Sequence, residues 1–331
     1  MTGEDGQEVR AIQFDRFGGP EVLEYREVRV AEPGAGQARV KHTAVGVNFI
    51  DVYHRTGLYP LRLPSGLGSE AAGIVVATGA GVTHVKPGDH VAYNAAGSLG
   101  SYSEERLVDA RWLVKLPRAI DDRAGAAMML KGLTAWYLLN RTYKVARGDS
   151  ILLYAAAGGV GLIAAQWARH IGARVIGIVS TEEKRALAME HGCEHVLLAS
   201  DDIRTRVRAL TDGRGVPVVY DSVGRDTFVQ SLDCLRTHGL LVSFGNASGP
   251  VAPFSLLELT KRGSLYVTRP TLGDFIRERA DLEAGCAELF GLVERGVVRI
   301  EVNQTYALAD AASAHRDLEA RRTTGSTVLL P

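Results

Sequence analysis

The chain has 331 residues, of which 46% are hydrophobic and 23% are charged. This composition is typical of a globular protein rather than a disordered one, and the length predicts one large domain or two medium ones. The 38 Lys and Arg residues balance 38 Asp and Glu residues, so the net charge of zero excludes a global field that would attract nucleic acid or an anionic membrane.

The sequence contains no apolar run of about 18 residues, and its opening MTGEDGQEVR lacks the charged and then apolar pattern of a leader. We therefore expect a cytoplasmic protein with no membrane partner. The cysteines show no CxxC spacing, which argues against a disulfide framework and favours buried, small apolar side chains at Cys193, Cys234 and Cys286.

Short alternating segments broken by Gly and Pro turns occupy the first third of the chain. Strands are predicted at 37–48, 72–78 and 90–95, and only residues 1–9 look loose. This pattern predicts a compact, barrel-like β-rich unit.

The middle third alternates apolar strands with helices. Strands are predicted at 151–156, 174–179, 195–199, 216–221 and 239–245, and helices at 159–171, 182–191, 202–210 and 225–235. Such alternation predicts an α/β domain with a parallel, doubly wound sheet covered on both faces.

The last third begins with a strand predicted at 264–267, followed by a helix at 282–295 and a final strand at 326–330. We expect this tail to return to the β-rich unit. The predicted division is therefore a catalytic domain of residues 1–130 and 270–331, and a dinucleotide-binding domain of residues 131–269.

A glycine-rich turn, AAGGVG at 156–161, follows a predicted strand and opens a predicted helix. Gly158 and Gly161 keep two positions of the pattern G-x-G-x-x-G, while Ala156 replaces the first glycine. Gly158 would let the backbone approach a pyrophosphate, and Gly161 would permit close packing of helix on strand. A tight turn without a ligand is the alternative, but it does not explain three glycines in four positions.

The cofactor preference is predicted from the end of the second strand of this domain. An NAD-binding fold carries Asp or Glu there, whereas this chain has Ser180, with Lys184 one helical turn later. These side chains can donate to a 2′-phosphate, which favours NADPH. The alternative is an ordinary helix start, with Ser180 or Thr181 as the N-cap and acidic residues behind it.

A β-rich domain before a dinucleotide domain resembles the medium-chain alcohol dehydrogenases, whose zinc sites use cysteines from the first half of the chain. This chain has no cysteine before Cys193, and Ser69 stands where the zinc enzymes place a histidine ligand. Four histidines without thiolate or carboxylate partners at ligand spacing are expected to be structural or surface residues: His42, His54, His84 and His90. We therefore predict no metal site.

Seven segments together resemble the zinc-independent NADPH:quinone oxidoreductases, the zeta-crystallin-like group. They are NFIDVYHRTGLYP (48–60), LPSGLGSEAAGIV (63–75), LKGLTAWYLL (130–139), AAAGGVGLIAAQWA (155–168), VVYDSVGRD (218–226), SLDCLRTHGLLVSFGNASG (231–249) and GSLYVTRPTL (263–272). The resemblance implies a GroES-like catalytic domain and a Rossmann domain. It also implies NADPH-dependent reduction of a quinone bound in the interdomain cleft without a metal, and a homodimer.

The resemblance also implies roles for individual residues. Those expected beside the nicotinamide and the substrate are Asn48, Asp51, Tyr53 and Tyr59. Those expected to bind the cofactor are Thr134, Tyr137, Gly158, Gly159, Val160, Gly161, Ser180, Lys184, Ser222, Phe244, Gly245, Asn246 and Arg321, of which Ser180, Lys184 and Arg321 match the 2′-phosphate site. Ala199 departs from the family, which often places a tyrosine at that strand end to hold the adenine or its phosphate.

Structural alternatives exist for several of these residues. Asn48 and Asp51 would close a turn after a strand, and Tyr53 and Tyr59 would be aromatics at the edge of the core. Asp221 fits a strand end better than a catalytic acid. In the catalytic interpretation, Asn48 and the Tyr53 hydroxyl donate to negative charge developing on a quinone oxygen, and the proton comes from solvent.

Two other functions stay open. The same metal-free site would suit reduction of activated C=C bonds in enones or alkenals, and a largely non-catalytic NADPH-binding protein, RNA-binding or structural, is the third hypothesis. The absence of a basic stripe with interleaved aromatics makes nucleic acid an unlikely partner. The apolar segment 239–245 and the sheet edge near Tyr266 suggest a homodimer formed by edge pairing.

Overall fold

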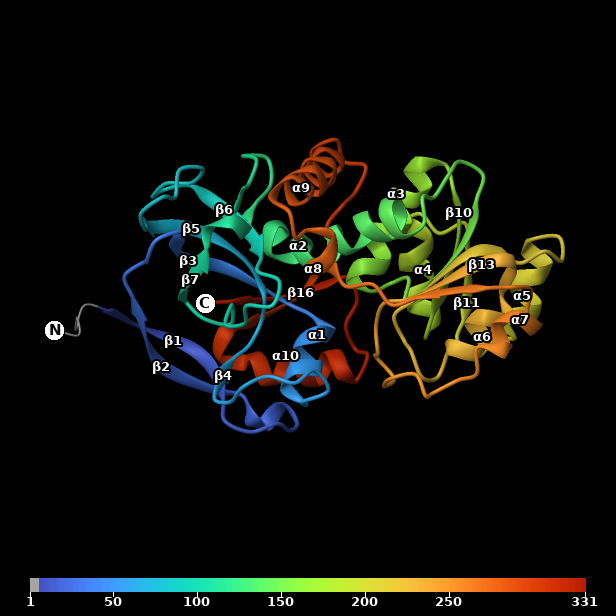
Figure 1. Cartoon of the computed structure of the whole chain (residues 1–331), viewed down its shortest axis with the longest axis horizontal. Coiled ribbons are helices and arrows are strands. Elements are labelled where there is room, and N and C mark those ends of the chain that lie inside the picture. The colour runs from blue at the N-terminus through green and yellow to red at the C-terminus, as the bar shows by residue number, and fades with distance from the viewer. Residues whose placement is uncertain (1–5) are drawn as a thin grey trace. The chain divides into compact units, whose positions relative to one another are not determined.

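The computed structural model describes residues 6–331, which fold as two compact units (Figure 1). The first unit extends to Leu130 and includes Ile276–Glu294 and Ile300–Pro331, and the second comprises Lys131–Phe275 and Arg295–Arg299. Residues 270–275 and 295–299, which the sequence-based division places in the first domain, thus lie in the second unit.

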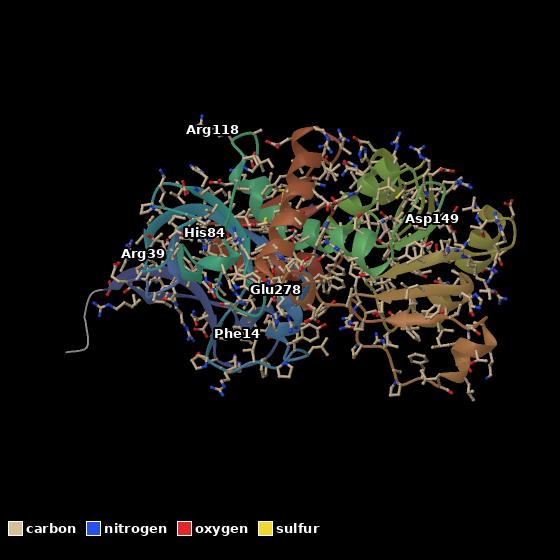
Figure 2. The ribbon with its side chains drawn as sticks, turned by 45° about the horizontal axis from the view of Figure 1, so that its top comes forward. Phe14, Arg39, His84, Arg118, Asp149 and Glu278 are labelled. Atoms are coloured by element: carbon tan, nitrogen blue, oxygen red, sulfur yellow. The ribbon has the colours of Figure 1, made fainter. Side chains whose placement is uncertain are left out.

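A small antiparallel sheet opens the first unit. Strand β1 (Gly6–Phe14) pairs along its length with β2 (Glu24–Ala31) and at its end with β4 (Ser65–Gly66). The prediction that residues 1–9 are loose is wrong for 6–9, because their backbone is hydrogen-bonded to β2; residues 1–5 lie outside the described part. Phe14, the last residue of β1, is fully buried, and its side chain is labelled in Figure 2.

The larger sheet of the first unit has seven strands. Their order is β15 (Val302–Ala307), β16 (Ser326–Leu330), β3 (Gln37–Val47), β5 (Glu70–Thr78), β6 (His90–Asn94) and β8 (Val114–Lys115), with β7 (Glu105–Asp109) paired to β3. The pairing of β16 with β3 confirms that the C-terminal tail returns to the first unit.

Helices complete the first unit, and only α9 among them was expected from the sequence. They are α1 (Phe49–Arg55), α2 (Asp122–Tyr137), which crosses the boundary at Leu130, α9 (Arg279–Glu294) and α10 (Ala311–Glu319), with single turns at Pro20–Val22, Ala110–Trp112 and Leu308–Asp310. Strand β3 ends at Val47 because the next residue is the N-cap of α1.

The second unit is built on a six-stranded parallel sheet, as predicted. The order is β11 (His195–Leu198), β10 (Arg174–Val179), β9 (Ser150–Tyr154), β12 (Val216–Asp221), β13 (Leu235–Ser243) and β14 (Tyr266–Thr268). In chain order this is 3-2-1-4-5-6, the arrangement of doubly wound dinucleotide folds. The direction of winding reverses between β9 and β12, so their carboxyl ends form the position where such sheets bind ligands.

Four of the six helices of the second unit were predicted, and the two short ones at 257–261 and 272–275 were not. The six are α3 (Gly159–Ile171), α4 (Glu182–Glu190), α5 (Ile203–Leu210), α6 (Phe228–Asp233), α7 (Leu257–Lys261) and α8 (Leu272–Phe275), with a π-helical turn at Leu138–Thr142. Residues from β9, β10, α5 and α6, including Leu152, Ile176, Val207 and Leu232, share one apolar cluster under the sheet. Burying such side chains contributes about 1.5–3 kcal/mol each.

Two boundaries around β12 differ from the prediction. Helix α6 starts three residues after the expected 225 and ends before β13, which begins four residues before the expected 239. The delay follows from Asp221, whose carboxylate accepts from the backbone N–H groups of Val223 (2.8 Å) and Gly224 (3.1 Å) and holds a turn there. Pro217 lies at the irregularity between β12 and β13, where its missing N–H costs no ladder bond.

Candidate active site

The first turn of α1 holds two of the residues predicted to contact the substrate. Asn48 is the N-cap, and its backbone N–H donates to the carboxylate of Asp51 at 2.8 Å, the reciprocal bond of a capping box. Both residues are buried. The alternative interpretation, in which the two residues close a turn after a strand, is therefore partly right, because they cap the N-terminus of α1. The bond between them also fixes the backbone position of Asn48, from which its side chain projects.

The Asn48 amide is oriented by a residue that the sequence did not single out. Its Nδ2 donates to Glu70 Oε1 at 2.8 Å, and the second Glu70 oxygen accepts from the Leu130 N–H at 2.5 Å. Gly46 makes room for this carboxylate, because a Cβ there would stand 2.2 Å from Glu70 Oε1. Since an amide NH₂ carries two hydrogens, the bond to Glu70 sets the direction of the second one.

Aromatic side chains cluster on the same helix. Tyr53 lies edge-on to Tyr59 with ring centroids 5.2 Å apart, and Phe49 lies 5.8 Å from Tyr53. The Tyr59 N–H donates to the Tyr53 carbonyl at 3.1 Å, which holds the segment after α1 against the helix. Tyr53 is buried and Tyr59 is half-buried, so the four predicted residues of the first unit come together around α1.

The predicted glycine turn connects β9 to α3. Ala155 adopts a left-handed φ of 51°, and Gly158 is the N-cap of α3. A Cβ on Gly161 would lie 2.3 Å from the Ala155 carbonyl oxygen, whereas one on Gly158 would meet only that oxygen, at 3.2 Å. Gly161 is thus required by packing inside the turn. Gly158, in contrast, is crowded by that single atom and less closely, so packing inside the fold accounts for its glycine less well than an external partner at the positive end of α3 does.

At the end of β10 the structure separates capping from the proposed phosphate contact. Thr181, not Ser180, is the N-cap of α4, and its Oγ1 accepts from the Lys184 N–H at 3.4 Å. Ser180 is exposed at the strand end. The acidic first turn is partly neutralised, because Glu182 pairs with Arg185 at 3.2 Å. Ala199 is exposed at the end of the neighbouring β11.

The loops after β12 and β13 pack tightly against each other. A Cβ on Gly245 would lie 2.3 Å from the Ser222 carbonyl oxygen, so only glycine permits this approach. Arg269 donates to the carbonyls of Ser243 (2.8 Å) and Gly245 (3.1 Å), which fixes the loop that carries Phe244 and Asn246, both half-buried.

Asp221 is committed to the fold. Besides the two backbone bonds, its carboxylate accepts from the hydroxyls of Thr227 (2.7 Å) and Ser231 (2.8 Å). The interpretation of Asp221 as a strand-end residue is thus the better one.

The remaining predicted cofactor residues lie in α2 and α3 of the second unit and, for Arg321, in the first unit. Thr134 and Tyr137 are buried in α2, and the Tyr137 ring stacks on Phe275 at 4.5 Å with nearly parallel planes. Gly159 and Val160 form the first turn of α3. Arg321 belongs to the first unit, where it is exposed just beyond α10 with a φ of 58°.

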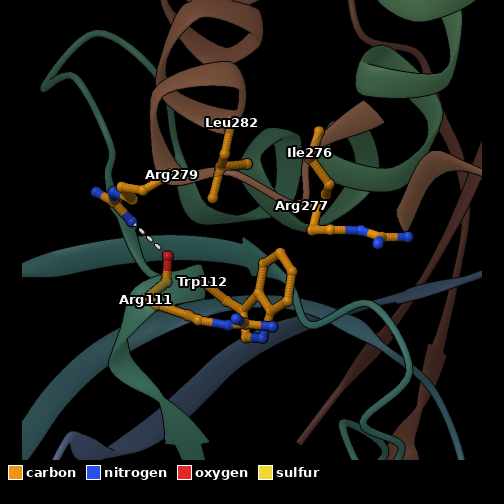
Figure 3. A pocket seen from close by; sticks show the side chains of 6 residues that line it. All are labelled: Arg111, Trp112, Ile276, Arg277, Arg279 and Leu282. Atoms are coloured by element: carbon orange, nitrogen blue, oxygen red, sulfur yellow. Dashed lines mark hydrogen bonds between the residues drawn. The ribbon is translucent and has the colours of Figure 1, made fainter. Parts of the chain in front are cut away.

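A small cavity lies between α9 and the turn at Ala110–Trp112 (Figure 3). It holds about 10 Å³ and is lined by Arg111, Trp112, Ile276, Arg277, Arg279 and Leu282. Arg279 spans it and donates to the carbonyls of Arg111 (2.7 Å) and Leu113 (2.8 Å). Since this volume suits at most a water molecule, the cavity is not a candidate for a cofactor or substrate.

Comparison with known proteins gives matches over nearly the whole chain. The family description "Alcohol dehydrogenase GroES-like domain" matches residues 34–118, and "Zinc-binding dehydrogenase" matches residues 159–287. The chain is 57% identical to the quinone oxidoreductase of Pseudomonas aeruginosa, over 98% of this chain and 100% of that protein. It is 46% identical to the 2-haloacrylate reductase of a Burkholderia species, over 98% of this chain and 99% of that protein.

A solved structure agrees with these matches. The crystal structure of Escherichia coli quinone oxidoreductase complexed with NADPH superposes with a TM-score of 0.95 at 48% identity, covering 97% of this chain and 100% of that chain. The predicted fold class, with a GroES-like domain and a Rossmann domain, is thereby confirmed.

The zinc named in one family description does not fit the side chains of this chain. Within residues 6–331, no group of three or more His, Cys, Asp or Glu side chains is placed to hold a metal. Burial raises the pKa of Cys193, Cys234 and Cys286 to about 12, which disfavours the thiolate that zinc requires. Ser69 is buried and accepts from the Asn94 amide at 3.3 Å.

Proposed function

Because the chain belongs to the quinone oxidoreductase family of the medium-chain dehydrogenases and reductases, we propose that it reduces quinones with NADPH and without a metal ion. The observation that carries the proposal is the similarity to enzymes of that name along the whole chain, at 57% identity in one case. The geometry supports it, since the first unit presents oriented hydrogen-bond donors and the second presents a dinucleotide turn.

NADPH fits the second unit in two respects. The turn at Gly158–Gly161 leaves backbone N–H groups at the positive end of α3, where a pyrophosphate would bind. The end of β10 carries Ser180 in place of the usual carboxylate, so a 2′-phosphate would meet a hydroxyl and, one helical turn later, the Lys184 ammonium group. We assign Arg321 to the same phosphate, and Thr134, Tyr137, Ser222 and Phe244–Asn246 to the rest of the cofactor.

When bound, NADPH supplies the reducing equivalents. The residues of the first unit act on the quinone. The Asn48 amide, directed by Glu70, and the Tyr53 hydroxyl donate to the quinone oxygen as it gains negative charge. Tyr59 and Phe49 pack around Tyr53, and together these side chains exclude water from the quinone ring. A quinone is already electrophilic, so these donors suffice without a Lewis acid.

The proposal is tested by initial rates on chelator-treated protein. NADPH and NADH are each combined with 1,4-benzoquinone, a naphthoquinone and a short enone. We expect chelator-resistant, NADPH-dependent reduction of the quinones. If the folded protein binds NADPH but reduces no acceptor, the proposed activity is wrong and a non-catalytic NADPH-binding role takes its place.

Reduction of activated C=C bonds is a second candidate, and one comparison favours it. The 2-haloacrylate reductase is 46% identical over almost the same length. The donors that stabilise charge on a quinone oxygen would equally stabilise charge on the oxygen of an α,β-unsaturated acid or enone. A 2-haloacrylate added as a further acceptor in the same assay separates the two, since turnover of the acrylate with no quinone turnover would select this second activity.

We further propose that the enzyme is a cytoplasmic homodimer of the zeta-crystallin-like branch. Its three cysteines are all unpaired and buried, which suits a reducing compartment. None of the helices in the described part of the chain has the length and apolarity needed to cross a bilayer.

The dimer would form along β14, the free edge of the parallel sheet, where Tyr266 is 61% exposed. Segment 239–245, which the sequence also suggested for dimer contacts, lies mostly in β13. Since β14 pairs with β13, this segment is not at the edge of the sheet. Exposed Leu256 and Leu257 lie on the same unit, and replacing both by Glu should shift the protein from dimer to monomer in sedimentation velocity. A wild-type monomer would contradict the proposal.

A further inference from the structure

A chain of hydrogen bonds between buried side chains runs through the first unit and ends at Asp51. The Tyr102 hydroxyl donates to Asp51 Oδ2 at 2.9 Å and lies 3.1 Å from His315 Nε2. His315 Nδ1 lies 3.1 Å from Arg55 Nη1, and Arg55 forms two bonds to Glu319, at 2.9 and 2.8 Å. Asp51, Tyr102, His315 and Arg55 are all fully buried.

The direction of every bond in this chain is fixed by chemistry. A guanidinium group only donates, so His315 Nδ1 must accept from Arg55. The imidazole hydrogen is therefore on Nε2 and donates to the Tyr102 oxygen, which leaves the Tyr102 hydrogen for Asp51. Burial and the Arg55 charge lower the pKa of His315 to about 3, and burial raises that of Tyr102, so both stay neutral.

The fold holds the Tyr102 ring from several sides. The backbone N–H of Tyr102 donates to the Leu67 carbonyl at 2.9 Å, and the backbone carbonyl of Tyr102 accepts from the Ile12 N–H at 2.8 Å. The ring packs directly on Gly68, where φ is 82° and a Cβ would lie 2.2 Å from Tyr102 Cδ1. On the other side, α10 brings His315 to α1, and the two helices lie next to each other (Figure 1).

Such a network is not explained by stability. Buried charges such as Asp51 and Arg55 lose hydration, and apolar side chains of similar volume often stabilise a fold as well or better. What the network does fix is the acceptor geometry of Asp51 Oδ2, the atom that also receives the Asn48 backbone N–H. Asn48 is thereby held at its backbone by Asp51 and at its amide by Glu70.

We propose that Tyr102 and His315 are positioning residues for substrate reduction: they orient Asp51, which sets the Asn48 amide at the start of α1. The proposal rests on the function proposed above, in which Asn48 donates to the substrate oxygen. His315 acts as a fixed donor and acceptor and does not carry protons.

Two pairs of variants test this role. Tyr102→Phe removes the hydroxyl between His315 and Asp51. Tyr93→Phe is its matched control, because Tyr93 is also fully buried and its hydroxyl also bonds to a histidine, His42 Nε2 at 2.8 Å, as well as to Ser101 Oγ at 3.0 Å. In the second pair, His315→Gln keeps an acceptor for Arg55 and a donor for Tyr102, whereas His315→Leu keeps neither.

For Tyr102→Phe we expect kcat with a quinone to fall about tenfold, with the NADPH Kd unchanged, while Tyr93→Phe retains the wild-type kcat at a temperature where both are folded. His315→Gln should stay within about twofold of wild type, and His315→Leu should match Tyr102→Phe. Equal losses in the two Tyr variants would show a merely structural role, and His315→Gln as inactive as His315→Leu would show a titrating role; either result overturns the proposal.

Hydrogen exchange of the Asn48 backbone N–H, which donates to Asp51, provides a measurement that does not depend on turnover. Tyr102→Phe should speed its exchange at least fivefold and Tyr93→Phe should not, whereas a change in both or in neither contradicts the inference. If the wild-type protein reduces no acceptor, the proposed function fails on its own, and the exchange data still decide whether the network positions Asn48. The Tyr pair also decides the matter if His315→Leu does not fold.

Discussion

The two glycines that frame the nucleotide turn are expected to fail in different ways when each is replaced by Ala. In Gly161→Ala, the new methyl would stand 2.3 Å from the Ala155 carbonyl oxygen and 2.7 Å from that of Ala156. Both atoms are backbone and cannot rotate away, so α3 must shift from the sheet. Overpacking of this kind costs about 1–3 kcal/mol, and the fixed obstacle places this variant at the upper end.

Gly158→Ala meets a milder internal obstacle. The new methyl meets only the Ala155 oxygen, at 3.2 Å, and the backbone at Gly158 (φ −84°, ψ 173°) is open to any residue. The weaker N-cap tendency of Ala is offset by the lower entropy of the unfolded chain, so stability should change by less than about 1 kcal/mol. The methyl would, however, project where the pyrophosphate approaches.

The assay measures thermal unfolding of the unliganded variants and NADPH binding by fluorescence titration. Gly161→Ala should lower Tm by about 5–10 °C. Gly158→Ala should keep Tm within about 2 °C of wild type and weaken NADPH binding at least tenfold, about 1.4 kcal/mol. A Gly158→Ala protein that binds NADPH normally would refute the argument that this glycine serves an external phosphate.

Three further predictions concern charge, catalysis and pH. Lys184→Ala should raise the KM for NADPH about fivefold and leave that for NADH unchanged, while the control Lys261→Ala affects neither; an equal effect on both cofactors would remove Lys184 from the phosphate site. Tyr53→Phe should lower kcat/KM by tenfold or less, about 1.4 kcal/mol, because the hydroxyl assists the substrate oxygen without being an obligate acid, and complete loss would contradict this. Burial lowers the pKa of His42 to about 4 and of His315 to about 3, so the unfolded chain binds more protons between these values and 6.5. Their contribution to the free energy of unfolding is complete above pH 6.5 and is lost as pH falls, by up to about 1.4 kcal/mol per histidine and pH unit. Urea unfolding at pH 7 and pH 5 measures this loss. His315→Gln should reduce the dependence of the unfolding free energy on pH by the amount that one proton contributes.

The sheet of the second unit and the helices α3 to α6 could be predicted because their signals are local. Each strand is a short apolar run, and α3 ends at Gly172, whose φ of 95° requires glycine. Helix α2 was missed for a physical reason. The sequence of α2, DRAGAAMMLKGLTAWY, is mostly apolar around its whole circumference and lacks the alternation of faces that marks a surface helix.

The residues of the candidate site likewise divide into those that local sequence motifs reveal and those that depend on long-range contacts. Asn48, Tyr53 and Gly158 lie in contiguous motifs, so their segments could be found from the sequence. Glu70 and His315 could not, because their contacts join residues far apart in the chain: Glu70 meets Asn48 across 22 positions, and His315 meets Tyr102 across 213. No spacing rule connects such pairs.

The class of acceptor follows from what holds the donors at α1. A zinc ion would place a full positive charge beside a substrate oxygen, and its ligands here would be the side chains around Ser69; these are instead a hydroxyl and an amide bonded to each other. In the proposed function Asn48 contributes a neutral amide, whose direction is set by the bond to Glu70 and whose backbone is held by Asp51. Oriented neutral donors of this kind stabilise developing negative charge by a few kcal/mol, less than is needed to activate an unactivated carbonyl. The proposed function therefore favours an acceptor that is electrophilic before it binds, a condition that a quinone and an activated alkene both satisfy.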